Sequence, residues 1–495
     1  MRFPILRGTP GLFACAALAF TALGLAAPAA RAQTAPDWTQ RPAVGAAPRL
    51  ELPPVERFTL SNGLTVLLME RHAVPVVQAN LIVRAGSADD PAGREGLAAL
   101  TADLLDEGAG SRTALELADA VEFLGASLAT GASYHATTVA LHTPAARLDS
   151  ALALLADVAL RPRFQSAELD RIRATRLTAF AQRRDQPNAL AAVAVDRALY
   201  GDGHPYGRPV AGTPAALGAL APDVLAAFYR ARFRPGNAAL VVVGDVTAAA
   251  LRPRLEALFG AWESVPVAPA RVAEGRQVAR RTVLLVDKPG AAQSAIRIAR
   301  IGAPRSADDY VALNVLNTIL GGSFTSRLNQ NLRERNGYAY GASSSFAFRP
   351  VAGPFVAAAN VQTASTAEAI TEFFNELRGL LRPVPADELA KAKSNLALSF
   401  PEPFASVRGT ASVLADLYLY DLPADYLATY TDRVRAVTAA DLARVARRYV
   451  DPERVAVVVV GDRALVEAKM RALNLGPFTV QSADDVLGPA RPAGD

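Results

Sequence analysis

Histidine and cysteine, the residues most often used to bind transition metals, are scarce in this chain of 495 residues. The four histidines are His72, His135, His142 and His204, and the one cysteine is Cys15. A single cysteine excludes a disulfide framework and any cysteine-rich zinc or iron–sulfur site. His135 and His142 lie seven residues apart in a strand-like stretch, so their side chains should point to opposite faces. We therefore predict no metal bound by this chain, and expect each histidine to be a surface or packing residue.

A second set of polar residues could stabilise negative charge on a substrate. Residues 320–346 read LGGSFTSRLNQNLRERNGYAYGASSSF, in which Arg333 precedes Tyr340 by seven residues. A guanidinium and a phenol both donate hydrogen bonds to an oxygen that gains negative charge. The alternative is that Arg333 caps its helix or pairs with a carboxylate, while Tyr340 packs on a sheet. Tyr338 shares a strand face with Tyr340, so spacing alone does not choose between the tyrosines.

The chain contains an internal repeat with an offset of 217 residues. Two apolar, strand-like segments recur in the second half, and the later one keeps a Gly-Asp pair after it and a proline before it. Three matches at one offset indicate a duplicated domain, because the period far exceeds that of a solenoid repeat. The matched pairs are Thr65–Glu70 with Thr282–Asp287, Leu240–Asp245 with Val457–Asp462, and Pro235 with Pro452.

Apolar periodicity predicts an α+β fold, with helices packed on one face of a mixed sheet in each of two homologous domains. Predicted strands are 64–69, 76–83, 137–142, 239–243, 282–286, 295–300, 338–348, 354–360 and 455–460. Predicted helices are 96–106, 114–124, 148–159, 167–182, 188–199, 310–320, 326–335, 367–381, 385–398 and 439–449.

The N-terminus has the pattern of a secretory signal peptide. Arg2 and Arg7 precede an apolar run over residues 11–27, and Ala30-Arg31-Ala32 is typical of a cleavage site. A membrane anchor is the alternative, but the run is short. We expect cleavage after Ala32 and a periplasmic or exported protein, with no membrane span in the mature chain. Cleavage removes three arginines and lowers the formal net charge from +5 to +2, which argues against a nucleic-acid partner.

The predicted domain organisation follows from the repeat and the signal peptide. It comprises a signal peptide (1–32), an N-terminal linker (33–51), a first domain (52–265), a linker rich in proline and alanine (266–275), a second domain (276–480) and a C-terminal tail (481–495).

Three motifs resemble those of the pitrilysin/insulinase family of zinc metallopeptidases. They are RAGSADDPAGREGL at 84–97, HPYGRP at 204–209, and the LGG, SRL and LRE elements within 320–346. In that family the first motif runs into H-x-x-E-H, whose histidines bind zinc and whose glutamate is the general base. The resemblance places these positions at Ala99, Ala102 and Asp103, so the zinc motif is degenerate. It places the acidic third ligand near Ala189, or at Asp185 or Asp196 if the alignment slips.

The resemblance implies a processing-peptidase-like subunit that forms a half-shell and uses Arg333 and Tyr340 to hold the substrate backbone. We expect the first domain to be metallopeptidase-like without a complete catalytic site, and the second to carry the Arg/Tyr pair. The chain would bind no zinc and would pair with a zinc-bearing H-x-x-E-H subunit. The two half-shells would close around a chamber that admits unfolded peptides. An inactive peptide-binding or assembly protein is the alternative, whereas the missing ligands argue against a zinc peptidase that acts alone.

Overall fold

The computed structural model describes residues 50–269, 271–423 and 425–489. The predicted signal peptide and its cleavage site, most of the N-terminal linker and the last six residues lie outside the described residues. No helix in the described ranges is both long enough and apolar enough to cross a membrane.

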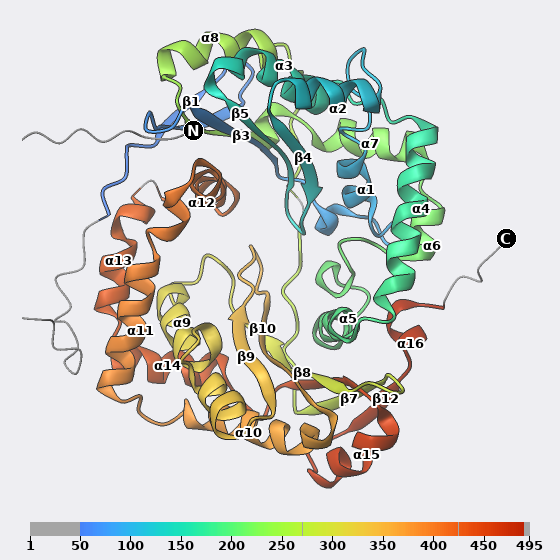
Figure 1. Ribbon diagram of the computed structural model, residues 1–495, viewed down its shortest axis with the longest axis vertical. Coiled ribbons are helices and arrows are strands. Elements are labelled where there is room, and N and C mark those ends of the chain that lie inside the picture. The colour runs from blue at the N-terminus through green and yellow to red at the C-terminus, as the bar shows by residue number, and fades with distance from the viewer. Residues whose placement is uncertain (1–49, 270, 424, 490–495) are drawn as a thin grey trace, which may run out of the picture. The chain divides into compact units, whose positions relative to one another are not determined.

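The first sheet has six strands in the order β1-β2-β6-β3-β5-β4 (Figure 1). Strands β2 and β6 are parallel, and the other neighbours are antiparallel. Every residue of β6, which reads AALVVVG, is buried, as expected for a central strand covered on both faces. The strands are β1 (Glu56–Thr59), β2 (Thr65–Glu70), β3 (Val76–Val83), β4 (Ser127–Ala132), β5 (Thr137–Pro144) and β6 (Ala238–Gly244).

The second sheet also has six strands, in the order β12-β7-β11-β8-β10-β9. Strand β7 is parallel to both of its neighbours, β12 and β11, and the remaining pairs are antiparallel. The strands are β7 (Thr282–Asp287), β8 (Gln293–Ile301), β9 (Ala339–Phe346), β10 (Pro354–Gln362), β11 (Ala456–Gly461) and β12 (Phe478–Gln481).

The strand pairing reproduces the sequence repeat. Thr65 pairs with Ala239 in the first sheet, and Thr282 pairs with Ala456 in the second, so both partners shift by 217 residues. The α+β fold with two homologous domains is therefore confirmed. The outer strands break the repeat, because β1 is antiparallel to β2 whereas β12 is parallel to β7.

Helices cover both sheets, and two of them, α5 and α12, each pack on the sheet of the other half of the chain. One face of the first sheet packs against α3 and α8, and the other packs against α12, which comes from the second half. In the second sheet, α9, α10 and α14 lie on one side, and α5 of the first half contacts β8 and β11 on the other. In Figure 1, α12 lies beside the upper sheet and α5 beside the lower one.

The helix bounds are close to the predicted ones where a prediction exists. They are α1 (Leu97–Asp103), α2 (Ala114–Phe123), α3 (Leu148–Leu160), α4 (Ser166–Arg183), α5 (Pro187–Tyr200), α6 (Pro214–Gly218), α7 (Pro222–Arg232), α8 (Ala248–Phe259), α9 (Tyr310–Asn317), α10 (Thr366–Gly379), α11 (Ala386–Ser399), α12 (Val407–Leu419), α13 (Tyr426–Ala436), α14 (Ala439–Tyr449), α15 (Arg463–Ala472) and α16 (Ala483–Leu487). Two π-helical segments, η5 (Thr318–Gly322) and η6 (Asn329–Arg335), follow α9.

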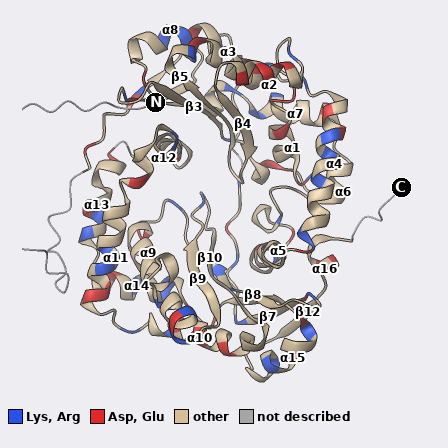
Figure 2. Cartoon of the chain, in the orientation of Figure 1, with Lys and Arg blue, Asp and Glu red and all other residues tan. Residues whose placement is uncertain are grey.

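Acidic and basic residues are interspersed over the helices of both halves (Figure 2). Ion pairs such as Arg171–Glu107 and Arg327–Glu388 join neighbouring elements. This mixture of signs fits the nearly balanced charge of the sequence.

Candidate functional site

The degenerate zinc motif lies on α1, and its residues do not fit a metal ion. Ala99 and Ala102 are buried and have no ligating atom. Oδ2 of Asp103 lies 2.7 Å from both Nε and Nη2 of Arg176 on α4. The Arg176 guanidinium therefore already pairs with the one carboxylate of the motif, and its positive charge would repel a metal cation at the same place.

The other histidines and carboxylates in the described ranges do not compensate for this loss, since no three of them come together as a possible metal site. The histidines have separate partners. His72 lies 2.7 Å from Asp245 Oδ1, His142 lies 3.2 Å from Gln78 Oε1, His135 lies 2.5 Å from Tyr206 Oη, and His204 lies 2.9 Å from the Ala273 carbonyl. His135 precedes β5 instead of lying in it, so the alternation argument for His135 and His142 was wrong.

The positions considered for a third ligand lie on or next to α5. Ala189 is in the first turn of α5, where its neighbour Asn188 accepts a hydrogen bond of 2.7 Å from Arg297 of β8. Asp185 pairs with Lys288, and Asp196 accepts a hydrogen bond from Tyr134. Arg297 and Lys288, the partners of Asn188 and Asp185, lie in the second half of the chain. Arg176, the partner of Asp103, lies on α4 of the first half.

Two buried carboxyl groups flank α1. Asp90 accepts hydrogen bonds from the backbone N–H groups of Gly96 and Ala98, at 2.8 and 2.9 Å, and so caps the start of the helix. Burial still raises its pKa to about 7. Asp106 accepts a hydrogen bond of 3.2 Å from Thr130 on the edge strand β4, and burial raises its pKa to about 6.

The HPYGRP turn joins the two halves of the chain. The ring of Tyr206 is buried, and the Arg349 guanidinium of the second half lies 4.4 Å from its centroid. Arg349 also lies 3.9 Å from the ring centroid of Tyr134. These contacts give the turn a packing role, which the sequence motif alone did not reveal.

Arg333 and Tyr340 lie side by side. The Arg333 Cζ atom is 5.4 Å from the centroid of the Tyr340 ring and 4.4 Å from that of Phe324. Tyr340 is 88% exposed and Phe324 is 67% exposed, so neither ring is used in the core. The alternative in which Tyr340 packs on the sheet is therefore wrong.

A β-bulge separates Tyr340 from Tyr338. Ala339 pairs with Val361 and Ala342 pairs with Ala359, so Tyr340 and Gly341 together oppose the single residue Asn360. A bulge redirects side chains from the regular alternation. Tyr338 precedes β9 and packs against the core, so the prediction that the two tyrosines share a face was wrong.

Asn329 connects the two segments that carry the pair. Its Oδ1 accepts a hydrogen bond of 3.0 Å from the Ala342 N–H of β9, and its Nδ2 donates to Ser323 O and Ser326 Oγ, both at 3.3 Å. Gly321 lets η5 lie close to β9, because a Cβ atom at this position would be only 2.3 Å from the Ser344 nitrogen. Sequence reasoning missed Asn329. An asparagine inside a predicted helix next to Leu328 was the available signal, because a buried amide needs hydrogen-bond partners.

The pair lines a shallow cavity of about 440 Å³. Besides Arg333 and Tyr340, its polar lining includes Arg297, Asn329 and Asn360. Arg297 and Asn360 were also missed, although each is a polar residue within an otherwise apolar strand segment.

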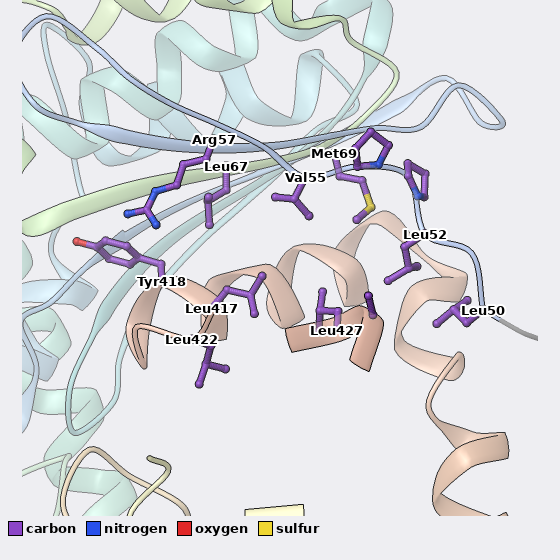
Figure 3. A pocket seen from close by; sticks show the side chains of 13 residues that line it. Leu50, Leu52, Val55, Arg57, Leu67, Met69, Leu417, Tyr418, Leu422 and Leu427 are labelled. Atoms are coloured by element: carbon purple, nitrogen blue, oxygen red, sulfur yellow. The ribbon is translucent and has the colours of Figure 1, made fainter. Parts of the chain in front are cut away.

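A second pocket, of about 270 Å³, is mostly apolar and lies between the start of the first domain and the helices of the second half (Figure 3). Leu67 and Met69 of β2 face Leu417 of α12 and Leu427 of α13 there. Arg57 and Tyr418 are the polar residues of its lining, and the remaining lining residues are apolar.

Comparison with known proteins relates both halves of the chain to one family of peptidases. Residues 65–213 match the model described as insulinase (peptidase family M16), and residues 219–396 match the peptidase M16 inactive domain. The chain belongs to peptidase family M16, the pitrilysin/insulinase family. An uncharacterized zinc protease of Mycobacterium leprae is 29% identical to this M16 chain over 343 residues, which are 69% of this chain and 76% of the relative.

Solved structures of other proteins share the fold. The crystal structure of a peptidase M16 inactive domain from Pseudomonas fluorescens is 26% identical, with a TM-score of 0.78 over 82% of this chain and 98% of that one. A protease from Helicobacter pylori, 22% identical with a TM-score of 0.76, covers 83% of this chain and all of its own, and shows the same fold.

Proposed function

We propose that this M16 chain is the non-metal subunit of a two-chain zinc metallopeptidase. In this proposal a partner with an intact H-x-x-E-H motif supplies the zinc and the general base. This chain supplies Arg333 and Tyr340, which donate hydrogen bonds to the backbone of an unfolded peptide. The proposal includes export through the predicted signal peptide, so that the two subunits meet outside the cytoplasm.

The observation that carries the proposal is the contrast between the two halves. The α1 motif has lost its ligands and its remaining carboxylate is paired with Arg176, whereas Arg333 and Tyr340 remain exposed and adjacent. An exposed tyrosine next to a guanidinium contributes little to folding, so its geometry favours a role in binding. Loss of one donor to a developing oxyanion typically costs about 2.7–4 kcal/mol of transition-state stabilisation.

The test mixes the purified chain with an H-x-x-E-H relative exported by the same organism, and measures peptide cleavage and zinc content of each chain. Cleavage should require both chains, and zinc should be found in the partner alone. Arg333→Ala or Tyr340→Phe should lower kcat/KM of the mixture by roughly 100-fold or more. Arg335→Ala is the matched control, because Arg335 lies on the same segment and pairs with Glu376.

Two outcomes would decide against this role. Full activity of the mixture after both substitutions would refute the donor role of the pair. Binding of the partner or of peptides without any gain in cleavage would favour the alternative, an inactive peptide-binding or assembly protein.

A further inference from the structure

The cavity beside Arg333 and Tyr340 contains a second guanidinium whose charge is not neutralised. Arg297, on β8, donates to the carbonyl oxygens of Ile296 and Ala359, at 2.8 and 3.4 Å, and to Oδ1 of Asn188 at 2.7 Å. All three partners are neutral. Within the described ranges no carboxylate oxygen lies within 4.0 Å of this guanidinium, unlike the many arginines that form ion pairs.

An unpaired cation in a partly dry position is costly, and it favours any anion that can reach it. Arg297 is half-buried, and this burial lowers the pKa of its guanidinium. The side chain nevertheless lines an open cavity, so a ligand has access to it.

Besides Arg297, the residues Arg333 and Asn360 bring polar groups to the lining of this cavity. Arg333 has one weak ionic contact, from Nε to Glu334 Oε1 at 3.4 Å, which leaves its two terminal nitrogens for a ligand. Asn360 lies at the β-bulge, and its Oδ1 atom is buried and accepts no hydrogen bond from any described residue. The cavity therefore offers donors from two guanidiniums together with one acceptor that lacks a donor.

We propose that this cavity binds a carboxylate group of a peptide, held by Arg297 and Arg333, while Asn360 Oδ1 accepts a peptide N–H. A peptide carries both groups, and guanidiniums match the geometry of a carboxylate. The inference rests on the proposed function only in taking the ligand to be a peptide. The carboxylate comes either from the C-terminus or from an aspartate or glutamate side chain.

Binding of three labelled versions of one short unfolded peptide to the purified chain tests the inference. One version ends in a free carboxylate, one ends in an amide, and one ends in an amide but contains an internal glutamate. At least one carboxylate version should bind about tenfold or more tightly than the neutral amide. The version that does so identifies the source of the carboxylate. Equal affinity for all three, or no binding of any of them, would overturn the inference.

Asn188→Asp is the decisive variant, because it replaces one atom and places an internal carboxylate on Arg297. It should abolish the preference for the carboxylate peptide and keep the affinity for the neutral amide. Arg335→Gln is the control and should keep the preference. A preference that survives Asn188→Asp would overturn the role of Arg297.

These results are separable from the proposed function. Equal binding of acid and amide peptides, with cleavage still present in the two-chain mixture, would remove the carboxylate inference alone. A carboxylate preference in a chain that never supports cleavage would remove the peptidase role alone.

Discussion

Replacing Asp196 with asparagine is expected to stabilise the protein at neutral pH and to change little in acid. Asp196 lies on α5, where its Oδ2 accepts a hydrogen bond of 3.3 Å from the Tyr134 hydroxyl. Burial raises the pKa of its carboxyl group to about 6 from an ordinary value of 3.8, although the charge of Arg349 acts in the opposite direction. The folded protein therefore favours the neutral form of this side chain more than the unfolded chain does, and ionisation above about pH 6 costs stability.

The size of the effect follows from the difference in pKa. A group whose pKa is raised on folding contributes stability below the pKa of the unfolded state, and that contribution is lost as pH rises through the folded pKa. The window here runs from about pH 4 to about pH 6. A difference of about two units corresponds to about 3 kcal/mol, which is an upper limit because the folded structure can relax. Asparagine has the same shape, stays neutral and can still accept from Tyr134.

Urea unfolding between pH 4 and pH 8, followed by circular dichroism and tryptophan fluorescence, measures this difference. The variant should match the wild type near pH 4 and exceed it by up to about 3 kcal/mol above pH 6. Asp202→Asn is the matched control, since Asp202 is exposed and pairs with Arg197, and it should shift stability by less than about 1 kcal/mol. A variant that is less stable than the wild type at pH 7 would refute the reasoning, because the ionised carboxylate would then be favoured through Arg349.

Three further predictions concern the site and the exchanged helices. Arg176→Ala should cost about 1–3 kcal/mol of folding stability, because it leaves Asp103 without its partner, and metal analysis should still find no bound zinc. Asn329→Ala should cost about 1–3 kcal/mol, because the Ala342 N–H loses its acceptor. It should also lower the activity of the two-chain mixture, and unchanged activity would show that Asn329 does not position Arg333 and Tyr340. Leu414→Ala on α12 should cost about 2–5 kcal/mol and destabilise both halves together in denaturant unfolding, whereas loss of the second half alone would contradict the exchange of helices.

Much of the fold could be predicted from local patterns. The repeat at 217 residues marked the central strands, and their pairing keeps that offset. The four-residue strands β1 and β12 were missed because so short a segment carries little periodicity. Helix α12 was also missed, although Ala411, Leu414 and Leu417 follow a helical spacing.

The candidate site was predicted in part. The family resemblance selected Arg333 and Tyr340, and the structure places them side by side. Arg297 and Asn360 join the same cavity from neighbouring strands, and Asn188 of the other half accepts a hydrogen bond from Arg297. Long-range contacts of this kind leave no spacing signal, so a single sequence does not reveal them.

The sequence by itself determined that the side chains at positions 99 and 102 can neither bind a metal ion nor accept a proton, because both residues are alanine. It also determined the duplicated α+β architecture, since strand and helix periodicity are local properties. Only the tertiary structure decided that Asp103 pairs with Arg176, that α5 and α12 each pack on the sheet of the other half, and that no carboxylate among the described residues pairs with Arg297. Those facts depend on distances between residues far apart in the chain, which packing of the whole core sets.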